Sequence, residues 1–326
     1  MLKKLKQKVI ISIVIAGVLY LTFTIYADFT NVINAFKKFN FLLLPILLLL
    51  SFLNYFTRFL KWDYYLSVVK VKMKKFDSLS TFMSGLIMSV TPAKLGEVLK
   101  SVLVKEITGE PISKTAPIIL AERITDFFSL LIIAISGAIL FDYGGDVTFV
   151  VAAFFLFLII IISNKKIALT IINISEKIPF IKKYIHHIHS AYESSYQLLK
   201  IKPLILMTLL SLISWGFECL GYYLILINFD VDFGFLWASF SYSFSTIVGA
   251  ISMLPGGLGF TEGSLTFLLV QKKVPMDISV ATTFIVRVVT LWFAVLVGII
   301  SLSLYQKRYG KLQTESMQST LQSSEK

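Results

Sequence analysis

Several charged residues lie inside stretches of sequence that are otherwise apolar enough to cross a membrane. The stretch LAERITD contains Glu122, Arg123 and Asp126, whose spacings of three and four residues place them on one side of a helix. Arg287 lies in a later apolar stretch and has no acidic residue within one turn of its own helix. An arginine at the centre of a spanning helix costs about 2.5–3.5 kcal/mol even on lenient scales, so it must face protein. These residues predict either a site for an anionic substrate or coupling ion, or structural ion pairs that lock helices together.

Two apolar stretches, residues 78–104 and 235–270, are interrupted by proline and glycine. The first interruption reads TPAKLGE and the second reads LPGGLGFTEG. Proline ends a helix because it lacks a donor and clashes with the preceding turn, and glycine permits a tight reversal. Irregular backbone at membrane depth is tolerated only where it is buried in protein or lines a wet cavity. The interruptions therefore predict two re-entrant hairpins whose free N–H groups could hold an anion. The hairpin backbone residues would be Pro92, Gly96, Pro255, Gly256, Gly257, Gly259 and Gly263.

The two interruptions share their spacing to an arginine. Both read P-x-x-L-G followed shortly by a glutamate, and the proline precedes an intramembrane arginine by 31 residues in the first and 32 in the second. The two glutamates, Glu97 and Glu262, are candidate partners of Arg287. They could also carry protons or cations, or cap the returning half-helices. The parallel predicts two related halves, about 1–141 and 147–305.

The composition is that of an integral membrane protein. Of 326 residues, 56% are hydrophobic and 15% are charged, and the mean hydropathy is +0.80. A helix needs about 20 apolar residues to cross a hydrocarbon core of about 30 Å. The segments of sufficient length are 9–26, 41–60, 115–141, 147–163, 203–228 and 277–304. We therefore predict an all-α polytopic membrane protein with about six full spanning helices and two re-entrant broken hairpins.

The order of these segments predicts an inverted repeat. Three spans precede the second half, so its hairpin would open on the opposite side of the membrane from the first. Inverted repeats with broken helices that meet near the midplane are a recurring plan of secondary transporters. Counted from their helix starts, Arg123 and Arg287 would approach the midplane from opposite sides. We expect the two guanidinium groups to converge in one polar chamber.

The basic residues predict the orientation in the membrane. The net charge is +12, and with the amino terminus inside, 25 of the 31 lysines and arginines lie in predicted cytoplasmic segments. This bias is the positive-inside rule, so both termini would be cytoplasmic in a multi-pass protein of the cell membrane, and no nucleic acid partner is needed. The first span reads as an uncleaved signal anchor. Within a transmembrane domain 1–305, residues 164–202 predict an amphipathic cytoplasmic insert, and 306–326 a disordered tail.

No complete catalytic set is present in the sequence. There is no P-loop, nucleophile elbow or zinc-ligand cluster, and no histidine lies in a predicted span. Asp230 and Asp232 resemble an acidic pair that holds a metal–sugar-phosphate, but in a short loop they favour an ordinary turn. The single cysteine, Cys219, favours a core position. We therefore predict a protein that is not an enzyme and that carries no catalytic residue, metal site or cofactor.

Three segments, PAKLGE, AERITD and LPGGLGFTEG, together resemble the signature segments of the lysylphosphatidylglycerol synthase transmembrane-region family, also described as flippase-like membrane proteins. The resemblance covers about 9–305, and the segments occur in the family's order. The family's P-x-x-x-G-E element corresponds to Pro92, Gly96 and Glu97, and its E-R-x-x-D element to Glu122, Arg123 and Asp126. Its P-G-G-x-G-x-x-E-G element corresponds to residues 255–263. One departure is Lys94, where an arginine is common.

The resemblance implies a protein that moves a lipid headgroup between leaflets, with membrane lipids as its partners. Lipid aminoacylation is not expected, because no soluble aminoacyl-transferase domain accompanies the spans. Relatives without that domain are linked to polyprenyl-phosphate sugar or lipid-linked oligosaccharide pathways. Arg123 and Arg287 would anchor the headgroup phosphate, with charge balanced by Glu97, Glu122, Asp126 and Glu262.

Three other functions are compatible with the residues. A secondary transporter of a soluble anion would use the same architecture. A membrane enzyme acting on a polyprenyl-phosphate sugar would use Asp230 and Asp232 to bind metal. A regulatory or assembly protein would use the intramembrane charges only as structure. The motifs specify neither the lipid that is moved nor the number of copies that assemble.

Overall fold

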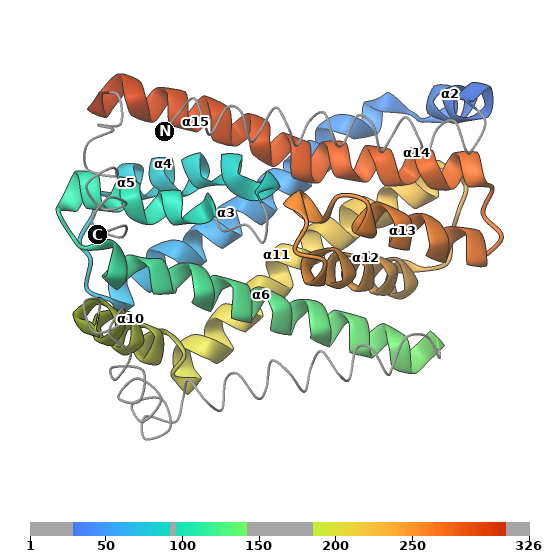
Figure 1. Ribbon diagram of the computed structural model, residues 1–326. Coiled ribbons are helices and arrows are strands. Elements are labelled where there is room, and N and C mark those ends of the chain that lie inside the picture. Colours follow the sequence, from blue (N-terminus) through green and yellow to red (C-terminus); the bar gives the residue numbers. More distant parts are fainter. Residues whose placement is uncertain (1–28, 92–95, 142–184, 311–326) are drawn as a thin grey trace.

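The computed structural model describes residues 29–91, 96–141 and 185–310 (Figure 1). All regular structure in these ranges is helical, which confirms the predicted all-α class. Three helical segments in them are long and apolar enough to cross a membrane: Phe41–Val68, Ile201–Asn228 and Met276–Tyr309. They contain the spans predicted at 41–60, 203–228 and 277–304, and the first continues to Val68. The span predicted at 115–141 lies within the helix Ile112–Phe141, which is not among these three. The predictions for 9–26, 147–163, Pro92, Lys94, most of the insert and most of the tail fall outside the described residues.

The first half contains two long helices with a broken helix pair between them. Its elements are α2 (Phe29–Lys38), η1 (Phe41–Leu43), α3 (Leu44–Val68), α4 (Lys75–Gly85), η2 (Leu86–Val90), α5 (Leu99–Thr108) and α6 (Ile112–Phe141). The pair α4 and α5 lies over the stretch predicted at 78–104.

The second half repeats this order after one additional helix, α10 (Ile185–Leu198), which packs against α6. Its elements are α11 (Ile201–Asn228), α12 (Phe235–Ile251), η4 (Pro255–Gly257), α13 (Phe260–Gln271), α14 (Met276–Arg287), the π-helical η5 (Val288–Trp292) and α15 (Phe293–Tyr309). The pair α12 and α13 lies over the stretch predicted at 235–270. Since α15 ends at Tyr309, its last turn passes the predicted domain limit at 305.

The two broken pairs lie at opposite ends of the bundle, and their interruptions meet in the middle (Figure 1). There η2 contacts η4, and α15 runs along both η2 and α4. Local sequence explains the second interruption, because Leu254 is extended before Pro255, and Gly256 and Gly259 have φ of 61° and 86°, which side chains with a Cβ rarely adopt.

The surface of the bundle is apolar and its interior is partly polar. Along α3 the exposed side chains are Ile46, Leu49, Phe52, Phe56 and Leu60, whereas the buried polar ones are Ser51, Asn54, Arg58 and Lys61. The same contrast holds on α11, where Ile205, Leu209 and Ile213 are exposed and Ser211, Ser214 and Glu218 are buried. A helix with apolar residues outside and polar residues inside is suited to a hydrocarbon surrounding.

Gly298 allows α15 to lie directly against the first interruption. A Cβ at this position would lie 2.2 Å from the backbone nitrogen of Ile87 and 2.9 Å from the carbonyl carbon of Leu86. Because those atoms are backbone, the Gly298→Ala side chain can fit only if a whole segment moves. We expect Gly298→Ala to destabilise the protein by about 1–3 kcal/mol, seen as a lower midpoint of thermal unfolding in detergent.

Gly216→Ala is the matched control for this substitution. Gly216 also lies within a long helix, α11, but a Cβ there would meet nothing within 4 Å. Because alanine is the better helix former, we expect Gly216→Ala to leave stability unchanged or raise it by up to about 1 kcal/mol. Equal midpoints for the two variants would show that the contact with Ile87 does not constrain the fold.

Candidate functional site

Each broken pair supplies one glutamate that pairs with the arginine predicted to lie beyond it. Glu262 accepts a hydrogen bond from Arg287 Nε at 2.7 Å, across 25 residues of sequence. Glu97 forms an ion pair with Arg123 across 26 residues. The same pair of residue types is therefore built twice, once in each half. Of the two candidate partners of Arg287, the structure selects Glu262.

Arg287 also ties α14 to the second interruption. Its Nη2 donates to the carbonyl oxygen of Gly256, and the second oxygen of Glu262 accepts from the backbone N–H of Gly259 at 2.7 Å. Glu262 thus caps the start of α13 and holds the guanidinium at the same time, so two of its predicted roles occur together. These contacts place the guanidinium beside bare glycine backbone.

Asp126 is the centre of a second, larger cluster of charges. It forms ion pairs with Lys61 and with Arg58, the latter at 3.2 Å, and it accepts from Ser211 Oγ at 3.0 Å. Beside it, Lys100 Nζ lies 2.5 Å from Glu122 and 3.6 Å from Glu97. The cluster joins α3, α5, α6 and α11.

For three cations of this cluster the prediction of a cytoplasmic position is wrong. The predicted cytoplasmic segments include 57–77 and 92–114, which contain Arg58, Lys61 and Lys100, but these side chains are buried, with exposed fractions of 8%, 1% and 2%. Because α3 continues to Val68, Arg58 and Lys61 lie well within the helix rather than at its end. A signal was present: the polar residues Ser51, Asn54, Arg58 and Lys61 recur every three or four positions, which marks one buried face.

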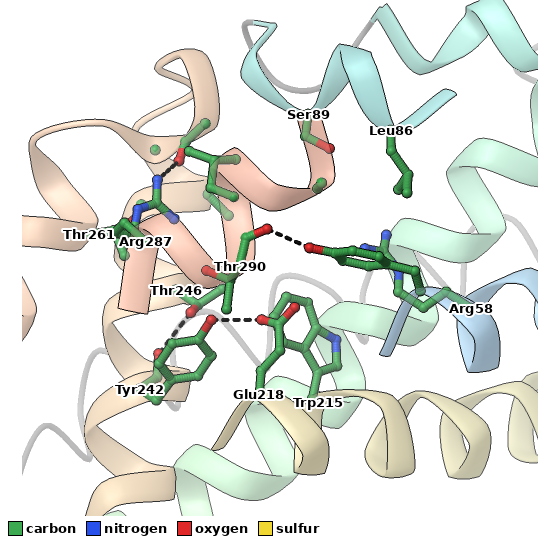
Figure 2. A pocket seen from close by; sticks show the side chains of 17 residues that line it. Arg58, Leu86, Ser89, Trp215, Glu218, Tyr242, Thr246, Thr261, Arg287 and Thr290 are labelled. Atoms are coloured by element: carbon green, nitrogen blue, oxygen red, sulfur yellow. Dashed lines mark hydrogen bonds between the residues drawn. The ribbon is translucent and has the colours of Figure 1, made fainter. Parts of the chain in front are cut away.

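A cavity of about 100 Å³ lies where the two interruptions approach each other (Figure 2). Arg58 from α3 and Arg287 from α14 both line it, together with Glu218 and Trp215 from α11. Backbone and side chains from both halves complete the wall: Leu86 and Ser89, then Gly249, Ala250, Gly256, Gly257 and Thr261. The cavity is thus formed by the two halves jointly.

The sequence predicts that Arg123 and Arg287 meet in one polar chamber, but the arginines that line this cavity are Arg58 and Arg287. Arg287 lines it, but Arg58 takes the place expected for Arg123, which lies instead against Glu97 and Asp126 and keeps a side-chain exposure of 22%. Glu97, Glu122 and Asp126 do not line the cavity either, and Glu262 acts there through Arg287. The side chain of Arg123 is directed instead toward Glu97, which lies just before α5 in the sequence.

Hydrogen bonds hold the cavity wall in place. Tyr242 donates to Glu218 Oε2 at 2.6 Å, and Tyr55 donates to the backbone carbonyl of Thr290 at 2.5 Å (Figure 2). Thr290 belongs to the π-helical turn that directly follows Arg287, a distortion often found at functional sites. The π-helical turn and the interruption at Gly256 therefore border the same space.

Two buried donors beside the cavity have no acceptor within the described part of the chain. They are Nε of Arg58 and Nε1 of Trp215. A buried donor without an acceptor is costly, so most such groups are paired with protein or ordered water. These two atoms are themselves enclosed, and the groups that the cavity offers to a ligand are the guanidinium groups of Arg58 and Arg287, which suit acceptor oxygens such as those of a phosphate or carboxylate.

The weaker sequence signals lie elsewhere. Asp232 accepts from the backbone N–H of Gly234 at 2.8 Å in the turn after α11, and neither it nor Asp230 lines the cavity. Cys219 is buried in the core. Among the described residues no group of histidine, cysteine, aspartate or glutamate side chains could hold a metal ion.

The apolar surface and the buried charges define this chain as a helical membrane protein. It belongs to the family described as the lysylphosphatidylglycerol synthase TM region, whose model matches residues 9–298. The resemblance expected from the three motif segments is thereby confirmed.

Its relatives include archaeal membrane proteins of the UPF0104 group. The chain is 28% identical over 218 residues to UPF0104 membrane protein MJ1078 of Methanocaldococcus jannaschii, which covers 65% of this chain and 91% of that protein. It is 23% identical over 286 residues to a UPF0104 membrane protein of Methanothermobacter thermautotrophicus, covering 79% and 83%. Over a shorter stretch of 118 residues it is 30% identical to UPF0104 membrane protein PH1989 of Pyrococcus horikoshii, covering 36% and 35%.

Proposed function

We propose that this protein is a lipid transporter of flippase type, which moves an anionic or polyprenyl-phosphate-linked headgroup between the leaflets of the cell membrane. The observation that carries the proposal is the cavity between the two interruptions, with Arg58 and Arg287 on its wall. Guanidinium groups bind phosphate through paired, charge-assisted hydrogen bonds. A phosphate held there would be sheltered from lipid by both halves of the protein.

The proposed mechanism uses the two broken pairs as re-entrant hairpins of an inverted repeat. The repeated Glu–Arg pairs and the opposite placement of α4–α5 and α12–α13 support this (Figure 1). In such repeats, one half rocks against the other so that a central site opens to each side in turn. The headgroup would bind between the interruptions and leave on the other side, while its tails stay in the bilayer.

The distribution of lysines supports the proposed orientation. α3, α5 and α15 finish at one end of the bundle (Figure 1), and the basic residues close in sequence to these helix ends are Lys70, Lys72, Lys74, Lys75, Lys105, Lys307 and Arg308. The opposite end, where α2 and α13 finish, carries Lys37, Lys38, Lys272 and Lys273. We propose that the first end is cytoplasmic, with both termini on that side. Arg58, Lys61 and Lys100 are left out of this comparison because they are buried.

The size of the cavity limits which ligand it can hold. At about 100 Å³ it is smaller than the 300–1,000 Å³ typical of sites for drug-sized ligands. That size fits a phosphate group rather than a whole sugar headgroup. It also fits a soluble anion, which is the second candidate.

A transport assay in proteoliposomes tests the proposal. Fluorescent lipids with phosphatidylglycerol, polyprenyl phosphate or phosphatidylcholine headgroups are added to one leaflet, and their appearance in the other is followed by quenching. We expect the protein to accelerate an anionic lipid at least about tenfold more than the zwitterionic one, because the choline ammonium of the latter would lie near the two guanidinium groups and like-charge juxtaposition costs more than about 1.4 kcal/mol.

Two other results would change the assignment. Uptake of inorganic phosphate into the vesicles, without lipid transfer, would favour the transporter of a soluble anion. Equal rates for all lipids with and without protein would remove the flippase proposal. Mass spectrometry of lipid that copurifies with the protein gives an independent identification of the headgroup.

A further inference from the structure

We propose that Glu218 takes up a proton when an anion binds in the cavity, so that the anion moves together with a proton. This inference rests on the proposed function, because it concerns the same cavity. It adds the coupling ion and names Glu218 as the residue that carries it, whereas the sequence analysis allows that role for Glu97 and Glu262.

Glu218 is the one acidic residue on the cavity wall within the described part of the chain. It lies on α11 and faces the same space as the guanidinium groups of Arg58 and Arg287. An anion held by those two groups would therefore lie beside the carboxylate of Glu218. Like charges close together in a low-dielectric interior favour protonation of one of them.

The charges of the two buried clusters, taken together with Glu218, balance before an anion enters. In the described helices the cations of the two clusters are Arg58, Lys61, Lys100, Arg123 and Arg287. The carboxylates are Glu97, Glu122, Asp126, Glu218 and Glu262. With five of each sign, a bound anion adds one uncompensated negative charge, which is costly away from water. Uptake of one proton restores the balance.

The surroundings of Glu218 favour it as the group that takes up the proton. Protonation of Asp126 or Glu262 would break ion pairs to Arg58, Lys61 or Arg287, and breaking a buried pair is strongly destabilising. The hydroxyl of Tyr242, 2.6 Å from Glu218, can donate to the carboxylate and accept from the carboxylic acid. That contact therefore persists in both protonation states.

Groups from every helix packed against α11 enter this balance. Tyr55 and Arg58 face Glu218 from α3, Tyr242 faces it from α12, and Arg287 from α14. From α6, Asp126 contacts α11 through Ser211. On α11 itself the nearest titratable side chains are Cys219 and Tyr222, both buried. The two arginines are the charged groups that an incoming anion would neutralise.

Calorimetry on the full chain in detergent tests the coupling. Short-chain phosphatidylglycerol and dimethyl phosphate, whose phosphodiesters both stay singly charged over the range, are titrated separately at several pH values, in buffers that differ in ionisation enthalpy. We expect the wild type to take up about one proton per anion at neutral or higher pH. As the pH rises, the affinity for the anion should fall by up to about tenfold per pH unit in the range where a single linked proton is taken up.

Variants test whether Glu218 is the residue that takes up the proton. Glu218→Gln imitates the protonated side chain, so we expect binding that varies by less than about twofold with pH and takes up no proton. Tyr242→Phe removes a donor to the carboxylate, so binding should extend to higher pH. Glu106→Gln is the matched control, because Glu106 also accepts from a tyrosine, Tyr305 at 3.4 Å, but does not line the cavity. It should keep the pH dependence of the wild type.

The outcomes separate this inference from the proposed function. Anion binding with proton uptake that persists in Glu218→Gln would overturn the inference and leave the transporter proposal standing. If Glu218→Gln does not fold, an unchanged pH dependence in Tyr242→Phe would overturn it. Failure of the wild type to bind either anion at any pH would overturn both. Response to phosphatidylglycerol but not to dimethyl phosphate would identify the lipid as the source of the anion.

Discussion

Arg287→Gln should reduce transport of an anionic lipid by at least about 30-fold in the proteoliposome assay. Arg287 donates to Glu262 and Gly256 and lines the cavity, so its loss removes one of two guanidinium groups from the proposed headgroup site. Truncating one partner of a buried charge pair costs about 2 kcal/mol or more, which corresponds to this factor. The initial rate of transfer between leaflets, normalised to folded protein, is the measurement.

Two variants separate this effect from misfolding. Glu262→Gln combined with Arg287→Gln removes both charges of the pair, so it should fold better than the single variant and still transport poorly. Arg123→Gln disrupts the equivalent pair in the other half, but Arg123 does not line the cavity. It should lose a similar amount of stability and retain transport within about threefold of the wild type when normalised. Comparable losses of transport in Arg123→Gln and Arg287→Gln would favour the site expected from the sequence.

Asp126→Asn should cause the largest loss of stability among the charged positions, about 3–5 kcal/mol. Asp126 is 3% exposed and holds Arg58, Lys61 and Ser211, so the substitution leaves two buried cations without their main counter-charge. The measurement is the free energy of unfolding in mixed detergent micelles, followed by loss of helical signal.

Asp63→Asn provides the control for that measurement. Asp63 pairs with Lys75 at the end of the bundle, but the lysine side chain is 81% exposed. An exposed pair contributes about 0–1 kcal/mol, so the control should be close to the wild type. If Asp126→Asn were as stable as Asp63→Asn, the cluster around Asp126 would not hold the helices together.

Much of the helix pattern could be predicted from the sequence. The long helices begin and end near the apolar segments, and the second interruption falls at Pro255 and the glycines that follow it. Proline geometry, the positive φ of Gly256 and the preference of apolar residues for hydrocarbon are local effects, so they act whatever the rest of the chain does. The spacing from glutamate to arginine, 26 residues in the first half and 25 in the second, corresponds to an ion pair in each half.

Which residues form the site depends on contacts between segments that are far apart in the sequence. Arg58, Lys61 and Lys100 looked like residues of a basic cytoplasmic edge, and only their partners Asp126 and Glu122 show why they are buried. Glu218 had no partner in nearby sequence, because Tyr242 and the cavity come from other helices. These contacts join residues from 22 to 68 positions apart, beyond the reach of helical periodicity.

The sequence by itself determined the class of protein, the position of the two interruptions and the pairing of residue types that follows each of them. The reason is that backbone sterics and the partition of side chains between lipid and protein are set within a few turns of helix. Tertiary structure alone decided which arginine joins Arg287 at the cavity. Which side of a helix faces the cavity depends on packing against its neighbours, and that packing brings Arg58 of α3 to the cavity while Arg123 of α6 lies against Glu97 and Asp126.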